Sequence, residues 1–230
     1  MELDRKAFLA ATAALLLAPA EVASAKAKPI TALPTSTMKR FAWTIDDGVS
    51  SSAVRSYLKI AENSNHHLTL FVTSCYPSWK ENSSQIRDLL EQGKIQLANH
   101  THSHRNLVAS SDVILKSQLQ GCHNFLLDEF GYDARPYFRP TYGYWDQRVL
   151  KLASELGYTA PVMWYGTLGD NGRNGSRKLL DLANKWIGNG RIVIDHANTP
   201  KTSYEIGGIL QIIRQKGLRS VTLTEAFSSN

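Results

Sequence analysis

The chain has few cysteines, no apolar run of membrane length and no tract of basic residues mixed with aromatics. Its 230 residues include two cysteines, Cys75 and Cys122, so a disulfide-rich scaffold is excluded and at most one disulfide can form. The spacing of these cysteines is not that of a zinc site. The formal net charge is +6, yet Lys and Arg are not clustered with aromatic side chains, so we expect no nucleic acid partner. An exported basic protein more often meets anionic cell-wall polymers.

The longest apolar run lies near the N-terminus and is too short for a confident membrane span. It covers residues 7–20 after a short charged start, and Val22-Ala23-Ser24-Ala25 follows with the small-x-small pattern of a signal peptidase site. We predict a signal peptide over 1–25, a linker over 26–38 and a folded domain over 39–230. We therefore expect export to the periplasm, the cell wall or the medium, with no stable membrane span once the signal peptide is cleaved. A retained anchor is the alternative, and the basic pair in the first residues leaves the twin-arginine route open.

Short apolar segments alternate with amphipathic ones from residue 39 onward. The predicted strands are Phe41–Ile45, Leu68–Thr73, Ile95–Asn99, Tyr137–Arg139, Thr159–Trp164, Arg191–Asp195 and Ser220–Thr224. The predicted helices are Ser52–Glu62, Ser83–Glu91, Ser111–Phe130, Asp146–Leu156, Ser176–Ile187 and Ser203–Lys216. Regular alternation of this kind implies parallel strands joined by crossover helices.

Polar residues at the strand ends distinguish between the two architectures that suit such a chain. Asp46, His100 and His196 follow three different predicted strands, Arg139 ends another, and Asp170 trails a fifth. An open sheet concentrates its site at one switch point, whereas a barrel brings many strand ends to one mouth. We therefore predict an α/β fold with a single domain, a distorted (β/α) barrel of about seven parallel strands.

Two adjacent carboxylates end the first predicted strand. Asp46 and Asp47 bring like charges together in a buried segment, which is unfavourable unless a metal cation or an arginine compensates them. Imidazoles follow at His100, His102 and His104. One carboxylate and two histidines leave a coordination position open, as in catalytic zinc sites, and the same donors suit Co²⁺, Fe²⁺ or Ni²⁺. The pattern indicates a metal-assisted hydrolase in which one aspartate is a ligand and the other a base.

The conformation of residues 100–104 decides which histidines act together. A helical or turn-like segment puts His100 and His104 on one face. A continued strand puts His102 on that face as well, which is typical of an amidohydrolase-like site. The residues alone leave both arrangements open.

The chain resembles the polysaccharide deacetylases of the NodB-homology group, carbohydrate esterase family 4. Five segments carry the resemblance, and they extend over most of residues 39–227. They are Thr44–Gly48, His100–His104, Arg139–Gly143, a weak segment around Asp170, and Ile192–His196. The resemblance implies that Asp47, His100 and His104 bind a divalent metal, most often zinc, and that His102 is a spacer.

The resemblance also implies the catalytic roles. Asp46 is expected to be the general base, oriented by Arg139, and the backbone N–H of Tyr142 to stabilise the oxyanion. His196 is expected to be the general acid, paired with Asp170. The family usually has a second aspartate and a tryptophan near the last of these residues, and this chain lacks both there. We expect Trp164 or Trp145 to supply the missing apolar wall.

The implied reaction is hydrolysis of the N-acetyl group of an N-acetylhexosamine glycan, either peptidoglycan or a chitin-like polymer, with release of acetate. Hydrolysis of O-acetyl esters or of small amides is the alternative on the same fold. A catalytically degenerate glycan-binding protein is the non-enzymatic alternative, against which the retained Asp46, Arg139 and His196 argue. The sequence gives no indication of the oligomeric state.

Overall fold

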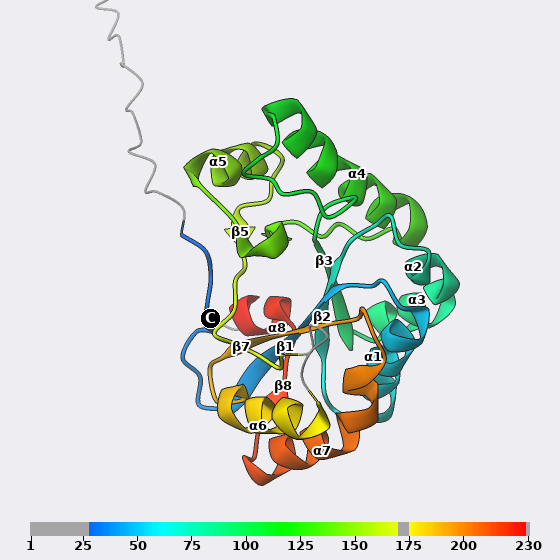
Figure 1. Cartoon of the computed structure of the whole chain (residues 1–230), viewed down its shortest axis with the longest axis vertical. Helices are drawn as coiled ribbons and strands as arrows, with labels where there is room; N and C mark the ends of the chain where they lie inside the picture. The colour runs from blue at the N-terminus through cyan, green and yellow to red at the C-terminus, as the bar shows by residue number, and fades with distance from the viewer. Residues whose placement is uncertain (1–27, 170–174, 229–230) are drawn as a thin grey trace, which may run out of the picture.

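The computed structural model describes residues 28–169 and 175–228, and its named strands pair in parallel throughout (Figure 1). The strands are β1 (Arg40–Asp47), β2 (Leu68–Val72), β3 (Ile95–Asn99), β4 (Tyr137–Phe138), β5 (Ala160–Pro161), β6 (Gly166–Thr167), β7 (Ile192–His196) and β8 (Arg219–Ser220). Their order is β5-β4-β3-β2-β1-β7-β6, and β8 pairs with the start of β1. The sheet curls into an open barrel, so the predicted fold class is confirmed.

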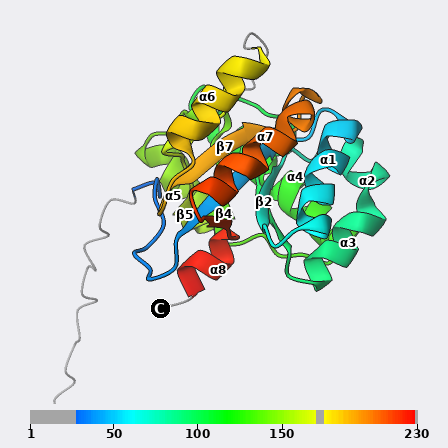
Figure 2. The same cartoon turned by 90° about the horizontal axis from the view of Figure 1, so that it is seen from below.

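Helices cover the outside of the curled sheet, and the last of them packs inside it through Leu223 and Ala226. They are α1 (Ser51–Asn63), α2 (Ser78–Glu81), α3 (Ser83–Glu91), α4 (Asp112–Phe130), α5 (Gln147–Glu155), α6 (Ser176–Trp186), α7 (Lys201–Gln215) and α8 (Leu223–Ser228). Helix α1 packs against α3 and α7, and α6 packs against α7 (Figures 1 and 2). Side-chain caps begin several helices, since Ser50, Ser111 and Asp146 each accept a hydrogen bond from the backbone three residues later.

Successive side chains of β1 point to opposite faces of the sheet and pack in two different apolar clusters. Phe41, Trp43 and Ile45 pack with the helices in the larger apolar cluster. Ala42 belongs to an inner cluster inside the barrel, and Asp46 lies on that same side of the strand. The strand therefore delivers a carboxylate to the interior at its carboxyl end while its other face anchors the helices.

Two predicted strands differ from those observed. The predicted strand Thr159–Trp164 shortens to β5, and β6 follows it as a second short strand. The two lie at opposite ends of the sheet, since β5 pairs with β4 and β6 pairs with β7. The predicted strand Ser220–Thr224 is shorter, because Leu223 already begins α8. Strands of two residues are too short to show a hydrophobic period, which is why the sequence did not separate them.

Residues 30–33 lie across the gap between β5 and β7, and we call them the N-terminal strap. Ile30 donates a backbone hydrogen bond to Pro161 at 2.8 Å and accepts one from Met163 at 2.7 Å, while Leu33 donates to Gly190 at 2.8 Å. Leu33 is buried in the inner cluster. Residues 30–33 of the predicted linker are therefore bound to the barrel, whereas residues 35, 37 and 38 are exposed.

Both cysteines are free thiols, so the possible disulfide is not formed. Cys122 is buried on α4 and donates to the carbonyl of Val72 at 3.1 Å, whereas Cys75 is exposed. Within residues 28–169 and 175–228 no helix is both long and apolar enough to cross a membrane. The predicted signal peptide lies outside the described residues and stays a prediction.

Candidate active site

A pocket of about 170 Å³ lies where β1, β3 and β7 end. Its lining combines acidic, imidazole and aromatic side chains: Asp46, Asp47, His100, His104, Pro140, Tyr142, Gly143, Trp164, Ile194, His196 and Asn198. Pockets that enclose a whole drug-sized ligand measure about 300–1,000 Å³. The smaller volume here suits one substituent of a larger substrate.

The end of β1 is built so that both aspartates face this pocket. A regular strand would send Asp47 to the helix side, but its backbone is left-handed, with φ at +74°. Gly48 continues the turn with φ at +99°, and a Cβ atom there would lie 2.4 Å from the Trp79 ring. The indole N–H of Trp79 donates to the carbonyl of Asp47 at 3.2 Å and to that of Thr73 at 3.1 Å. Trp79 thus fixes the turn that brings the second carboxylate into the pocket.

Residues 100–104 form an irregular loop rather than a continued strand. Thr101 and His104 have φ angles of +76° and +54°, so the strand alternation that would align all three histidines is broken. His102 turns away from the pocket, and its Nδ1 lies 2.9 Å from the hydroxyl of Ser74. His100 and His104 stay together, with ring centroids 5.0 Å apart.

The three residues predicted as metal ligands converge. One donor atom from each of Asp47, His100 and His104 lies within 4.8 Å of the others. Asp47 Oδ1 is 3.4 Å from His100 Nε2 and 3.3 Å from His104 Nε2. Tetrahedral bonds of about 2.1 Å to one ion separate neighbouring ligand atoms by about 3.4 Å. The two distances therefore fit a shared cation.

Hydrogen bonds in this cluster leave the required lone pairs free. Asp47 Oδ1 is buried and has no hydrogen-bond partner among the described residues. His100 Nδ1 lies 2.8 Å from the carbonyl oxygen of Arg139, which assigns the proton to Nδ1 and leaves Nε2 as an acceptor. A buried carboxylate oxygen without a donor is costly, and a cation would satisfy it. The site therefore fits a divalent metal.

Charges in the cluster shift the pKa of each member. Burial raises the pKa of Asp47, but hydrogen bonding and the charges of His100 and His104 outweigh burial and hold it far below its usual range. Burial lowers the pKa of His100, but the carboxylates of Asp46 and Asp47 outweigh burial, and the net pKa is raised. Burial and then the charge of His100 lower the pKa of His104, which favours the neutral imidazole that a metal requires.

Arg139 holds the other aspartate. Its side chain is 0% exposed, and Nη1 donates to Asp46 Oδ1 at 2.5 Å. The remaining donors bind the carbonyls of Val162 and Met163 and the hydroxyl of Thr44 at 3.0–3.3 Å. Every side-chain nitrogen of this buried cation is therefore hydrogen-bonded, and one carboxylate oxygen of Asp46 is held in place.

Tyr142 lies in a tight turn at the pocket rim, in the 3₁₀ helix η1 (Thr141–Gly143). Its φ is +60°, and its N–H is in the first turn, where a helix leaves the amide without an internal partner. A Cβ atom on Gly143 would lie 2.7 Å from the Trp164 ring, so that indole packs directly against the turn. Trp164 lines the pocket and Trp145 does not.

The comparisons with known proteins identify the family of the chain. Residues 34–161, more than half of the chain, match the family described as polysaccharide deacetylase. The chain belongs to the polysaccharide deacetylase family. Two curated relatives are peptidoglycan-N-acetylglucosamine deacetylases. The one from Listeria monocytogenes is 28% identical over 83% of this chain and 39% of its own length, and the one from Bacillus cereus is 26% identical over 81% and 87%.

The fold is also that of solved structures. The chitin deacetylase of Colletotrichum lindemuthianum superposes with a TM-score of 0.77 at 21% identity, covering 88% of this chain and 92% of that one. The chain spans about two fifths of the Listeria relative, whose remaining length has no counterpart in this match.

Two further predicted residues of this family member lie at or beyond the edge of the described site. His196 ends β7 and lines the pocket. Asp170 lies outside the described residues. Sequence reasoning missed Asn198, which lines the pocket and whose amide donates to Asp47 Oδ2 at 2.5 Å. No local motif marks this asparagine, because its contact with β1 joins residues 151 positions apart.

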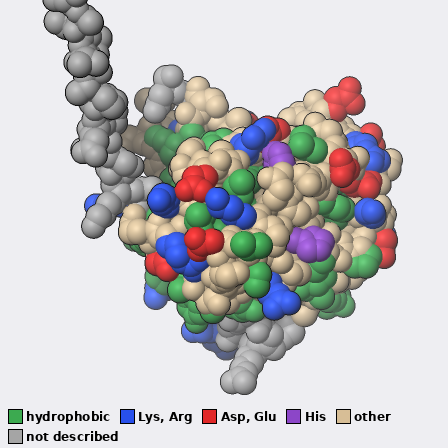
Figure 3. Space-filling view, turned by 90° about the horizontal axis from the view of Figure 1, so that it is seen from above, with side chains coloured by type: hydrophobic (Ala, Val, Ile, Leu, Met, Phe, Trp, Pro, Cys, Tyr) green, Lys and Arg blue, Asp and Glu red, His purple; other side chains and the backbone are tan. Residues whose placement is uncertain are grey.

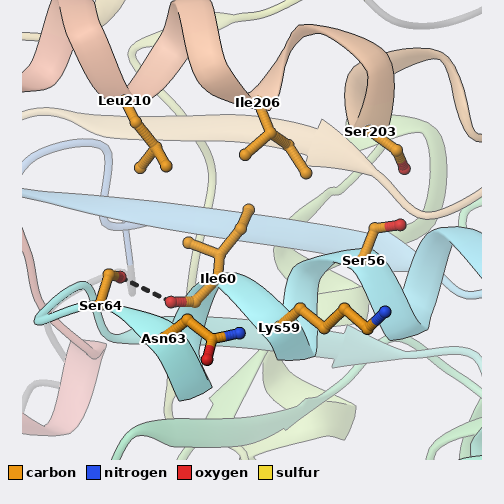
Figure 4. Close-up of a pocket in the computed structure, with 8 residues that line it drawn as sticks. All are labelled: Ser56, Lys59, Ile60, Asn63, Ser64, Ser203, Ile206 and Leu210. Atoms are coloured by element: carbon orange, nitrogen blue, oxygen red, sulfur yellow. Dashed lines mark hydrogen bonds between the residues drawn. The ribbon is translucent and has the colours of Figure 1, made fainter.

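A second hollow, between α1 and α7, has different chemistry (Figure 4). Ile60, Ile206 and Leu210 form its apolar part, and Lys59 is the ionisable residue of its lining. It lies on the helix side of the barrel and contains none of the predicted catalytic residues. On the face drawn in Figure 3, basic and acidic side chains are interspersed, so this face has no stripe of one charge.

Proposed function

We propose that this member of the polysaccharide deacetylase family is a metal-dependent hydrolase of the N-acetyl group of N-acetylhexosamine glycans, with release of acetate. The observation that supports this best is the presence, in one small pocket, of a three-donor metal cluster and a second aspartate held by a buried arginine. The names of the relatives, which act on peptidoglycan or chitin, support the glycan class.

Asp47, His100 and His104 are the residues that would hold the ion. One carboxylate oxygen and two imidazole nitrogens favour Zn²⁺, with Co²⁺, Fe²⁺ and Ni²⁺ as alternatives. When bound, such an ion polarises the acetyl carbonyl and lowers the pKa of a water molecule beside it. Three protein ligands leave coordination positions open toward the pocket.

Asp46 is the proposed general base. Arg139 occupies its Oδ1, so the carboxylate is held in one orientation, with Oδ2 on the side of His100 Nε2, 3.6 Å away. In this position Asp46 accepts a proton from the attacking water at the metal cluster. Since Arg139 has no other acidic partner among the described residues, its role is to orient this base.

Two other residues of the pocket lining are proposed to stabilise the developing charge and to protonate the leaving group. The backbone N–H of Tyr142 donates to the oxyanion, and His196 donates a proton to the departing sugar nitrogen. The resemblance assigns Asp170 to His196 as its partner. Trp164 and Ile194 form an apolar wall for the acetyl methyl group, the role that the sequence left open between two tryptophans.

The proposed substrate is a cell-wall glycan, peptidoglycan in the first place. Tyr142 and Tyr144 are each 57% exposed at the rim, with ring centroids 5.9 Å apart, and such aromatic faces suit sugar rings. The net charge of +6 suits an anionic wall, and the predicted signal peptide would deliver the protein there. The aromatic rim suits either glycan, whereas the charge and the predicted delivery to the wall favour peptidoglycan over uncharged chitin-like polymers.

The test is acetate release from N-acetylglucosamine oligomers and from peptidoglycan, using metal-stripped, zinc-loaded and cobalt-loaded protein. We expect metal-dependent release that falls about 10²- to 10⁴-fold in Asp46→Asn, because the general base is lost. Asp133→Asn is the matched control, since that exposed carboxylate pairs with Arg135 and, at 4.0 Å, with His123, and it does not line the pocket. Acetylated xylan in a parallel assay separates ester from amide hydrolysis. Metal-loaded protein that releases no acetate from any glycan contradicts the proposal.

A further inference from the structure

The two oxygens of Asp47 have different surroundings. Oδ1 is buried, faces the imidazoles of His100 and His104, and has no hydrogen-bond donor among the described residues. Oδ2 accepts a hydrogen bond from the side-chain amide of Asn198 at 2.5 Å. A carboxylate can bind a cation through one oxygen or through both, and here one of the two is already occupied.

Asn198 is held in one orientation. A carboxylate only accepts hydrogen bonds, so the NH₂ group of Asn198 must face Asp47. The opposite end of the amide then presents Oδ1 to the backbone N–H of Val49, at 3.4 Å. Both partners of Asn198 therefore belong to the turn at the end of β1.

The backbone around Asn198 is tied to the same turn. Ala197 donates to the carbonyl of Asp46 at 2.9 Å and accepts from the N–H of Ser50 at 2.9 Å. The loops that follow β1 and β7 are thus joined at their bases, where helices α1 and α7 begin side by side (Figures 1 and 2). Asn198 is delivered to Asp47 by a rigid connection rather than by a free loop.

We propose that Asn198 is a positioning residue for the metal ligand Asp47. By occupying Oδ2, it reserves Oδ1 for the cation and makes the carboxylate a one-oxygen ligand, which keeps coordination positions open for water and substrate. The inference rests on the proposed metal site and adds a residue to it. Hydrogen-bond partners of metal ligands typically contribute a factor of about 10–100 in metal affinity.

The experiment measures zinc affinity by chelator competition in wild-type protein, Asn198→Leu, Asn198→Ala and the control Asn124→Ala. Asn124 lies on the exposed side of α4, where its amide oxygen accepts a hydrogen bond from Gln120, so its loss leaves the metal cluster untouched. We expect both Asn198 variants to bind zinc about 10–100-fold more weakly. We expect excess zinc to restore most of their acetate release, because the catalytic groups remain.

Two readouts distinguish positioning from simple support of the loops. The visible absorption of cobalt-loaded Asn198→Leu should weaken if the freed Oδ2 also binds and raises the coordination number. Thermal unfolding of metal-stripped protein should change little, whereas a purely structural role would lower stability and leave zinc affinity and the cobalt spectrum unchanged. Unchanged zinc affinity in both variants overturns the inference. Wild-type protein that binds zinc and releases no acetate contradicts the proposed function and leaves this inference standing.

Discussion

Replacing Arg139 by methionine tests whether the buried ion pair of the proposed base is organised as described. Arg139 is 0% exposed and Asp46 is 2% exposed, so the variant leaves a buried carboxylate without its cation. It also leaves the carbonyls of Val162 and Met163 without these donors. Breaking a buried pair by removing one partner typically costs about 3–5 kcal/mol. We expect a loss of this size in the free energy of unfolding.

Urea unfolding of metal-stripped protein, followed by tryptophan fluorescence, measures the loss. The double variant Arg139→Met with Asp46→Asn should recover about 0.5–3 kcal/mol, because the amide does not need a compensating charge. The control Arg135→Met removes a surface guanidinium that pairs with Asp133, and it should leave stability nearly unchanged. A loss below about 1 kcal/mol in Arg139→Met, or a double variant without recovery, would refute the reasoning.

Three further predictions follow from the same structure. Gly48→Ala should destabilise the protein by about 1–3 kcal/mol in thermal unfolding, because a Cβ atom would overlap Trp79 in a left-handed turn; a change near zero would contradict this. A thiol reagent at pH 8 should modify Cys75 in the native state and Cys122 only after unfolding, because burial raises the pKa of the second thiol to about 12. In metal-stripped protein the pKa of His100 is raised by folding, so its charged form should stabilise the folded state fully below pH 6.5. This contribution should be lost as the pH rises through the pKa of His100 in the folded protein, which urea titrations at several pH values would detect. A rise in stability over that range would argue against the assigned charges.

The architecture was predictable because it depends on patterns that extend over many residues. Long helices and strands of five or more residues have a visible period, and the placement of Asp46 and His100 after strands favoured a barrel mouth. The short strands at Ala160–Pro161 and Gly166–Thr167 have no period to read, and their partners are set by the curl of the whole sheet. Local sequence patterns therefore predicted the longer strands of the sheet but not the short strands at its edges.

Residue types and spacing predicted a carboxylate with two histidines but also allowed His102, and the choice of Asp47, His100 and His104 came from the family resemblance. The backbone that brings these three together could not be predicted. Thr101 and Tyr142, like two of the three cluster residues, adopt left-handed φ angles that non-glycine residues rarely take. Such conformations cost about 1–3 kcal/mol each and persist only where surrounding contacts over-determine them. Those contacts come from distant segments, so no local reading of the chain can supply them.

Folding of the inner core of the barrel requires contacts between the two ends of the chain. Leu33 from the N-terminal strap and Leu223 from α8 pack in the same cluster, and the side chain of Arg40 donates to the carbonyl of Ala226, 186 residues away. Contacts over such separations form late in folding, because the intervening chain must first be ordered. A chain emerging from a translocation channel N-terminus first would therefore keep its barrel open until the last helix arrives. In a chain exported unfolded, the proposed active site, which depends on strands from both halves of the chain, would become functional only after translocation is complete.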